Sequence, residues 1–535
     1  MKLHISLLSL VLVWSITTDI IGGEASDKMK CGFGIQVQPA PAQVEKRVFA
    51  EADRPDRQHR YLVEDPPFLL HYDSESIHAI DMTIDNATGL PVWIVETEAA
   101  LKHAWHLLVD SLQFDPPPMD KVAYAKDPDG GAYDIYFRNF NFYGFTHPED
   151  SVTSTERPYD FTGYMEVEND FQGFPTEGIE GLRVTIAHEL FHLFHLGYAW
   201  KVRDLRVQDL WWYEISSSWF EDVAYPSVND YVAYVSHYFQ DPRPLHASGA
   251  DRLDGYRVAH YGSVLSDYDY PPLWEKIWSE FTNKGAYEAL DLSLRTLLGS
   301  SFTYSLRKFA GWNFFTGDHA VQGFGYPDAV LFPTISTDNA IVIPDSLPFS
   351  YQVSPKDIRY YQLERTMSSM PYFSLLQLGR PDPNYIGGVL GLDDQAPELH
   401  YMESNRSLDV RLERSGYNGL IAAVNSGTDS STFTLKNSDE LLRPYPNPLV
   451  LHQNQSNIHL YTLINETTSL EAEIYNLNAQ RVYRYTFPGG EYPAGTHSLT
   501  LPLQDQLISS LSNGVYIVRL KGKDVRQTAK ITILR

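Results

Sequence analysis

The stretch AHELFHLFH, Ala187 to His195, constrains this chain more than any other feature of the sequence. At about 100° per residue, its three histidines fall on one side of a helix. Leucines, phenylalanines and an isoleucine cover the opposite side. Such a helix buries its apolar side in a core and turns its imidazoles toward something polar. The sequence therefore predicts a buried helix that presents histidines to a metal ion.

Two of these histidines have the spacing of metal ligands. His188 and His192 are one helical turn apart, so both can bind one tetrahedral zinc ion, and Glu189 is where a water-activating base is needed. His195 lies about 10 Å from His188 along the axis, at about 1.5 Å per residue, too far for both to share one ion. We expect His195 to lie behind the ligands or in the cleft, or alternatively to be packed in the core.

A second predicted helix offers a carboxylate that completes the site. The stretch WWYEISSSWFED places Glu214 22 positions after His192, near the spacing of zinc enzymes whose third ligand is a glutamate. Glu221 lies seven residues farther along the same stretch. We expect Glu214 to be the third zinc ligand, with Glu221 as the alternative. Glu221 or Asp222 is then expected to orient a zinc-bound histidine through its other ring nitrogen.

These groups together predict a hydrolytic site. Zinc held by two neutral histidines and a carboxylate keeps one position for water, lowers the pKa of that water to about 7 and polarises a carbonyl. Glu189 would transfer the proton of the water to the leaving amine. A further donor must stabilise the oxyanion, and we expect Tyr261, with His260, Tyr234 and His237 as alternatives. The sequence predicts a zinc-dependent endopeptidase.

Charge and the N-terminus limit where the protein acts. The chain has 68 acidic and 42 basic residues, a net charge of −26, which argues against binding to nucleic acid or anionic membranes. Near the N-terminus, the apolar stretch ISLLSLVLVWSI follows Lys2. It has the length of a signal-peptide core and is too short to span a bilayer. No later apolar run is long enough to span a bilayer, so we expect an exported protein without a stable membrane span.

The length of 535 residues and the pattern along the chain predict several domains. Strand-like runs replace helical ones near residue 325, and prolines interrupt the strands again near residue 440. We expect the strand YMEVENDF, just before the histidine helix, to be the edge along which a peptide docks. We expect a signal peptide at 1–23, a loosely structured lead-in or propeptide at 24–64, a mixed α and β catalytic domain at 65–325, a β-sandwich of unknown role at 326–439 and an all-β domain at 440–535.

Five stretches in the first part of the chain carry a resemblance. FLLHYDS, YDIYF, YMEVENDF, TIAHELFHLFHLGY and WWYEISSSWFEDVAYPSVNDY, in this order, resemble a family of secreted zinc metalloproteinases from myxobacteria and Bacteroidetes-like bacteria, related in layout to the gluzincins. The resemblance implies a zincin-like α+β domain, with His188 and His192 as ligands, Glu189 as base and Glu214 as third ligand. This chain departs from the family at His195, where glutamine is frequent, and in a slightly longer gap before Glu214.

The C-terminal segment resembles another module. YPNPL, AEIYNLNAQRV, SNGVYIVRL and TAKITIL are similar to the C-terminal sorting domain of the type IX secretion system, a β-sandwich. The resemblance implies the type IX secretion machinery as a partner. It also implies export through the periplasm of a diderm bacterium to the cell surface or outside. The residues alone predict only a short all-β domain.

Two other functions compete with a peptidase acting on proteins or peptides. The first is a catalytically inactive cell-surface adhesin or glycan-binding protein, in which the β domains carry the function. The intact Glu189 argues against it, because a structural zinc site has no use for a base. The second is a zinc hydrolase that acts on non-protein amides, which no motif in the sequence separates from a peptidase.

Overall fold

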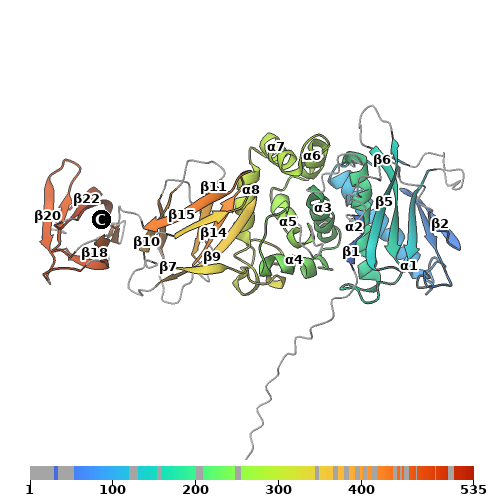
Figure 1. The fold of residues 1–535 in the computed structure, drawn as a ribbon, viewed down its shortest axis with the longest axis horizontal. Coiled ribbons are helices and arrows are strands. Elements are labelled where there is room, and N and C mark those ends of the chain that lie inside the picture. The colour runs from blue at the N-terminus through green and yellow to red at the C-terminus, as the bar shows by residue number, and fades with distance from the viewer. Residues whose placement is uncertain are drawn as a thin grey trace, which may run out of the picture.

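The computed structural model contains helices and several sheets, arranged along the chain (Figure 1). This mixed content agrees with the expected multi-domain chain. The structure describes residues 29–33, 54–119, 131–152, 160–199, 209–246, 255–343, 349–365, 372–378, 385–391, 398–401, 407–411, 419–437, 443–445, 449–450, 457–464, 467–488, 490–493, 495–503, 511–523 and 525–534.

The first sheet has six strands in the order β1-β5-β6-β4-β3-β2. Its strands β3, β4 and β6 are parallel, whereas β5 is antiparallel to β6. Helix α2 (Gly178–Ala199) packs on β5 and β6, and helix α1 (Val92–His106) packs on α2 (Figure 1). The strands are β1 (Met29–Cys31), β2 (His59–Glu64), β3 (Pro67–Tyr72), β4 (Tyr133–Arg138), β5 (Phe142–Val152) and β6 (Asp160–Glu168).

Two expectations about this sheet were wrong. Residues 164–168 of the stretch YMEVENDF lie in β6, which pairs with β5 on one side and with β4 on the other, so it is not an edge. The edge strand on this side is β1, which has only three residues and pairs with part of β5. The segment 24–64 is not all a loose lead-in either, because His59–Glu64 forms β2, fully paired with β3. Its exposed residues Arg60, Leu62 and Glu64 alternate with Tyr61 and Val63, so one face of this edge strand is open to solvent.

A group of helices follows the sheet, and Figure 1 shows it between the first sheet and the middle sheets. Its core is aromatic: the rings of Trp219 and Trp274 stack with centroids 3.7 Å apart, an arrangement that contributes about 0.5–1.5 kcal/mol beyond burial. The helices are α3 (Leu210–Ala224), α4 (Tyr231–Gln240), α5 (Tyr261–Ser266), α6 (Pro272–Phe281), α7 (Ala286–Leu298) and α8 (Phe302–Trp312), with the short 3-10 helices η4 (Tyr256–Val258), η5 (Gly317–His319) and η6 (Ala329–Leu331). The π-helical segment η2 (Leu107–Ser111) instead continues α1.

Two sheets make up the middle of the chain, in the orders β13-β10-β15-β8 and β12-β11-β14-β9-β7. Residues of β9 and β14, such as Tyr360 and Ala422, share one hydrophobic core with helix α8. The strands are β7 (Asp338–Ile343), β8 (Phe349–Val353), β9 (Asp357–Arg365), β10 (Tyr372–Leu378), β11 (Tyr385–Gly391), β12 (Glu398–Tyr401), β13 (Ser407–Arg411), β14 (Gly419–Asn425) and β15 (Ser431–Asn437).

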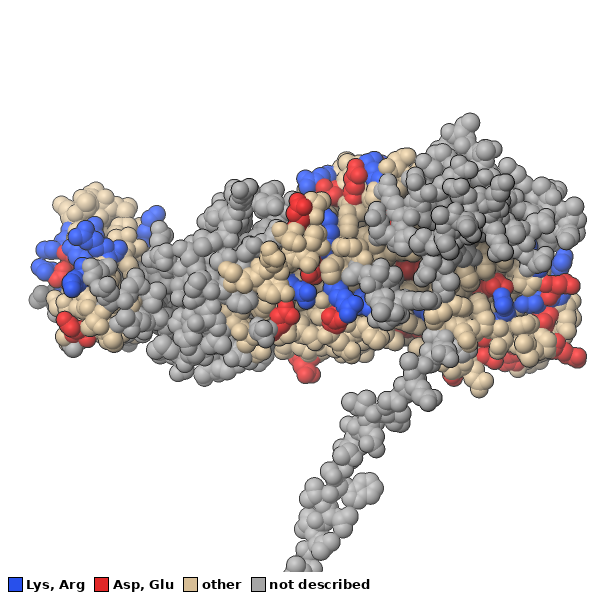
Figure 2. Space-filling model, viewed as in Figure 1, with Lys and Arg blue, Asp and Glu red and all other residues tan. Residues whose placement is uncertain are grey.

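The C-terminal segment has two further sheets, in the orders β16-β18-β21 and β17-β23-β22-β19-β20, which enclose a core of their own. Figure 2 shows basic side chains gathered over this unit; Arg481 and Lys521 form ion pairs with Glu473. Within the described residues, no helix is both long and apolar enough to cross a membrane. The strands are β16 (Arg443–Tyr445), β17 (Leu449–Val450), β18 (Asn457–Ile464), β19 (Glu471–Tyr475), β20 (Arg481–Thr486), β21 (Gly495–Pro502), β22 (Gly514–Lys521) and β23 (Arg526–Leu534).

Candidate metal centre

Helix α2 carries the two predicted histidine ligands. His188 and His192 are one turn apart, and both are buried. Their Nε2 atoms lie 3.1 Å from each other. Leu190, Phe191 and Leu193 on the same helix are also buried, in the main hydrophobic core, which fixes the rotation of the helix. The apolar face thus sets the direction in which the imidazoles point.

Helix α3 brings Glu214 to the same point. Its Oε2 atom lies 3.3 Å from the Nε2 of His188 and 3.3 Å from the Nε2 of His192. It receives no well-aligned hydrogen bond from any described residue. A tetrahedral zinc ion with bonds of about 2.0–2.1 Å separates its nitrogen and oxygen ligands by about 3.3–3.4 Å. The three atoms therefore have the mutual spacing that fits one zinc ion.

The charges in this cluster depend on each other. Burial alone would raise the pKa of Glu214, but the neighbouring His192 and His188 lower it to about 2. Burial would likewise lower the pKa of His188, but Glu214 and Glu221 raise it to about 9. The carboxylate thus stays ionised beside two imidazoles. A cation held by lone pairs of both rings would satisfy the same carboxylate.

The second nitrogen of each imidazole also has a partner. His188 Nδ1 lies 2.6 Å from Glu221 Oε1, and His192 Nδ1 lies 3.3 Å from the Nδ1 of His195. The ring of His195 stacks on Trp278, with centroids 3.9 Å apart. Such contacts fix the tautomer and the orientation of a ligating ring. His195 thus lies behind His192, and Glu221 lies behind His188.

Glu189 is held beside the cluster by strand β5. Its Oε2 atom accepts a hydrogen bond of 2.7 Å from the hydroxyl of Thr146, while its Oε1 atom has no hydrogen-bond partner among the described residues. A Cβ atom on Gly144 would lie 2.4 Å from the Cγ of Glu189. The glycine therefore lets the backbone of β5 pass directly over this carboxylate.

Tyr256 is a site residue that our sequence reasoning missed. Its ring lies 6.1 Å from that of His188, and burial together with the nearby Glu214 carboxylate raises its pKa well above the usual value. It follows Gly255, which has a φ of 83° and whose Cβ, if present, would lie 2.6 Å from that of Glu214. A glycine required for close approach to the ligand helix is the signal in the sequence that points to this tyrosine.

The structure does not bring Tyr261 to the cluster. Its hydroxyl bonds to the Oγ of Ser305 at 2.7 Å, and its ring packs against Phe309. His260, one of the alternatives, is buried among aromatic rings, where burial lowers its pKa to about 3. Tyr234, another alternative, packs against Tyr256.

One more described residue joins the cluster. The sulfur of Cys31 and the ligand atoms of His188, His192 and Glu214 all lie within 4.8 Å of one another. Cys31 is buried and lies in β1. It is the one cysteine of the chain, and nothing in a three-residue strand predicts its pairing with β5.

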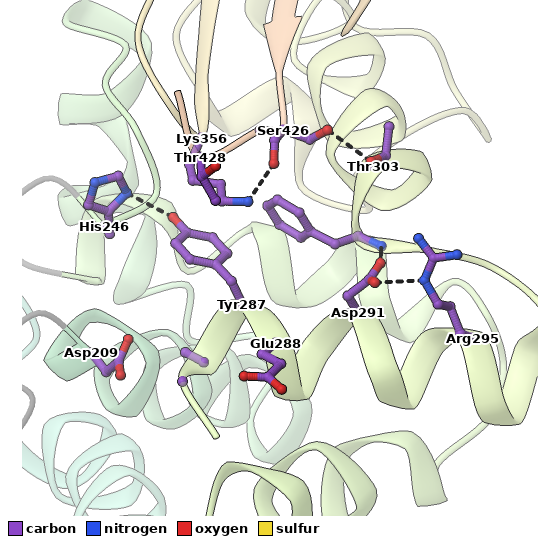
Figure 3. A pocket seen from close by; sticks show the side chains of 14 residues that line it. Asp209, His246, Tyr287, Glu288, Asp291, Arg295, Thr303, Lys356, Ser426 and Thr428 are labelled. Carbon is purple, nitrogen blue, oxygen red and sulfur yellow. Dashed lines mark hydrogen bonds and ion pairs between the residues drawn. The ribbon is translucent and has the colours of Figure 1, made fainter. Parts of the chain in front are cut away.

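A separate pocket of about 550 Å³ lies between helix α7 and loops of the middle sheets. Figure 3 shows Tyr287 and Asp291 on the helix side, facing Lys356 and Ser426 on the sheet side. The Lys356 ammonium donates a hydrogen bond to the Ser426 carbonyl. None of the predicted zinc ligands lines this pocket, so it is distinct from the metal centre.

A family model described as a secretion system C-terminal sorting domain matches residues 443–534. This segment is a secretion sorting domain. The match agrees with the predicted C-terminal module and means that the protein interacts with the type IX secretion machinery. The chain is therefore exported by type IX secretion to the cell surface or outside. No family model supports the resemblance to zinc metalloproteinases.

Solved structures resemble parts of the chain only weakly. A β-glucuronidase from Parabacteroides merdae is 12% identical with a TM-score of 0.16, and covers 42% of this chain and 32% of its own. A putative β-galactosidase from Bacteroides fragilis is 12% identical with a TM-score of 0.13, and covers 34% of each chain. The fusion protein EFF-1 of C. elegans is 9% identical with a TM-score of 0.14, and covers 26% of this chain and 38% of its own.

This chain thus spans about a third of each of these proteins. No protein of curated function matches the chain significantly.

Proposed function

We propose that this chain is a secreted zinc-dependent endopeptidase with a zincin-like catalytic domain. The observation that carries the proposal is the meeting of three ligand atoms, from His188, His192 and Glu214, at 3.1–3.3 Å from one another. Glu189, next to the first ligand on helix α2, supplies the base that hydrolysis needs. The sorting domain supports a site of action outside the cell.

The residues around the site have separate tasks. A bound zinc ion supplies Lewis acidity, which lowers the pKa of water and polarises the carbonyl of the scissile bond. The Glu189 carboxylate accepts a proton from the attacking water and delivers it to the leaving nitrogen. The Tyr256 hydroxyl, beside Glu214, donates a hydrogen bond to the oxyanion. Thr146 holds Glu189 in place through its hydrogen bond to Oε2.

Strand β5 supports an extended peptide as the substrate. It passes over Glu189 at Gly144. One side of β5 is covered by β6. Its other edge already accepts an extended segment, β1, through backbone pairing. A substrate strand added at this edge would place its carbonyl groups near the zinc ligands. This arrangement favours peptides over amides that lack a repeating backbone.

The test compares the protein with Glu189→Gln, each purified from the medium after export by type IX secretion. We expect both proteins to hold one zinc ion per chain by plasma emission spectrometry. Only the parent should hydrolyse casein or gelatin, because the amide of glutamine cannot accept the proton of water. Gelatin and casein are chosen because neither requires a narrow cleavage preference.

Two outcomes favour the competing functions. If both proteins hold zinc and neither cleaves casein or gelatin, the exported protein is latent or the site is that of a zinc hydrolase acting on non-protein amides. If neither protein holds zinc, the chain is a surface adhesin or glycan-binding protein, and the account of the metal centre is wrong.

A further inference from the structure

Strand β1 lies across the candidate metal centre. It pairs in parallel with β5, with Met29 opposite Phe142 and Cys31 opposite Gly144. The pairing continues for one residue, because the Gly32 amide donates a hydrogen bond of 3.1 Å to the Gly144 carbonyl. Gly144 is the residue below which Glu189 lies. The N-terminal segment Met29–Phe33 therefore crosses the site directly above its base.

The sulfur of Cys31 points into the cluster rather than away from it. It lies within 4.8 Å of the ligand atoms of His188, His192 and Glu214. Two buried carboxylate oxygens face the same space without a well-aligned hydrogen bond from a described residue, Glu214 Oε2 and Glu189 Oε1. A nearby cation stabilises a buried, ionised carboxylate oxygen that accepts no hydrogen bond. The Cys31 thiolate, the two imidazoles and the Glu214 carboxylate form a set of four ligands that suits zinc.

The residues on either side of Cys31 fasten the segment to the site. The Lys30 ammonium donates a hydrogen bond of 2.7 Å to Glu221 Oε2 and pairs with Asp230. The other oxygen of Glu221 holds His188. The ring of Phe33 stacks on the imidazole of His192, with centroids 4.1 Å apart and planes 7° apart. The segment thus contacts the predicted zinc ligands and Glu221 through Lys30, Cys31 and Phe33.

We propose that Cys31 is the fourth ligand of the metal site, and that Met29–Phe33 thereby holds the intact protein in a latent form. The proposal rests on the zinc site proposed above. A zinc site with four protein ligands is closed, whereas a catalytic site keeps a position for water. On binding, the thiol gives its proton to solvent, and its sulfur takes the position of water. When the segment leaves, the thiolate regains a proton and water replaces the sulfur.

Release requires a break in the chain after Phe33. The buried ion pairs of Lys30 and the pairing with β5 hold the segment while it remains joined to the domain. Cleavage removes the covalent link, so the segment is lost by dilution. The same cut frees the edge of β5 for a substrate strand.

Cobalt(II) provides a test that does not depend on activity. The chain has one cysteine, so a sulfur-to-cobalt charge-transfer band in the near-ultraviolet reports on Cys31 alone. The full-length protein, loaded with one cobalt ion per chain, is expected to show the band. Cys31→Ser should keep the ion and lose the band, and Met29→Leu, a change in the same strand, should keep both.

The outcomes separate this proposal from the function on which it rests. If the parent binds one cobalt ion and shows no such band, the role of Cys31 is refuted and the three-ligand site stands. If neither protein binds cobalt, the metal centre itself is wrong.

Activity tests the latency. Full-length Cys31→Ser is expected to hydrolyse casein without further cleavage of its own chain, while the full-length parent and Met29→Leu stay inactive until they are cut after Phe33. A full-length parent that hydrolyses casein as fast as Cys31→Ser overturns the latency. Glu189→Gln combined with Cys31→Ser should be inactive, which assigns the released activity to this site.

Discussion

Two carboxylates of helix α3, those of Glu214 and Glu221, have different tasks at the proposed metal centre. Glu214 meets the Nε2 atoms that face the cluster, and Glu221 meets the Nδ1 atom on the far side of His188. Both carboxylates are buried, and each lies beside a histidine ring that can carry a positive charge. In the proposed zinc site, Glu221 would therefore orient a ligand, while Glu214 would act as one.

Glu221→Gln is expected to weaken zinc binding about 10–100-fold, because the loss of a partner behind a ligating histidine typically costs that much. The measurement is competition with a chelator of known affinity. Asp222→Asn is the control, since Asp222 follows on the same helix and contacts no ligand in the described structure. Equal zinc affinities of Glu221→Gln and the parent would contradict the assignment.

Tyr256→Phe is expected to lower kcat about 10²-fold, the typical loss for one oxyanion donor, with zinc content unchanged. Tyr261→Phe is the matched control, because the Tyr261 hydroxyl bonds to Ser305. It should leave kcat near that of the parent. The reverse pattern, with Tyr261→Phe inactive and Tyr256→Phe active, would restore the residue first expected from the sequence.

Helix α3 illustrates how one element serves both the site and the stability of the fold. Glu214 and Glu221 face the metal centre, whereas Asp222 lies near the Asp328 carboxylate beside η6. Burial, with Asp328 and Glu221 nearby, raises the pKa of Asp222 to about 7. The unfolded chain holds this proton less tightly, since its aspartate has a pKa of about 4. Stability therefore falls as the pH rises from about 4 to 7.

Asp222→Asn should remove this loss. We expect the variant and the parent to melt at similar temperatures near pH 4, and the variant to melt higher at pH 8, where the parent must bury a charged carboxylate. Differential scanning calorimetry across this pH range makes the comparison. A parent that melts as high as the variant at pH 8 would show that Asp222 ionises in the folded protein without cost.

The helices of the site could be predicted from the sequence, but the short strand over it could not. The spacing of His188 and His192 determines one face of a helix, so α2 follows from periodicity. The helical spacing of Leu101, Ala104 and Leu108 predicts a helix capped by Thr97, but α1 begins at Val92, and the Thr97 hydroxyl bonds within it to the Trp93 carbonyl. Strand β1 has three residues, and its partner lies more than a hundred residues away, so no local pattern predicts it.

At the scale of the whole molecule, the sorting domain has a hydrophobic core separate from the one that surrounds the metal centre. Its sequence motifs all lie within one short segment of the chain, so their resemblance to a known module is enough to predict it. The proposed catalytic centre, in contrast, combines β1, β5, α2, α3 and η4, which are far apart in the sequence. The positions of Tyr256 and Cys31 depend on this tertiary packing, which the sequence does not reveal.

Removal of residues 443–534 is expected to block release into the medium, because the type IX secretion machinery no longer recognises the chain. The truncated protein should accumulate in the periplasm, since the signal peptide predicted at residues 1–23 would still direct it across the inner membrane. Immunoblots of cell and medium fractions make the comparison, with Glu189→Gln as a control that is released normally. Release of the truncated chain at the rate of the parent would refute the assigned role.

The most direct test of the central claim is anomalous diffraction at the zinc edge from crystals of the full-length protein grown with one equivalent of zinc. The account predicts one strong peak at bonding distance from His188 Nε2, His192 Nε2 and Glu214 Oε2. A peak elsewhere, such as in the pocket beside Tyr287, or no peak at all, would contradict it.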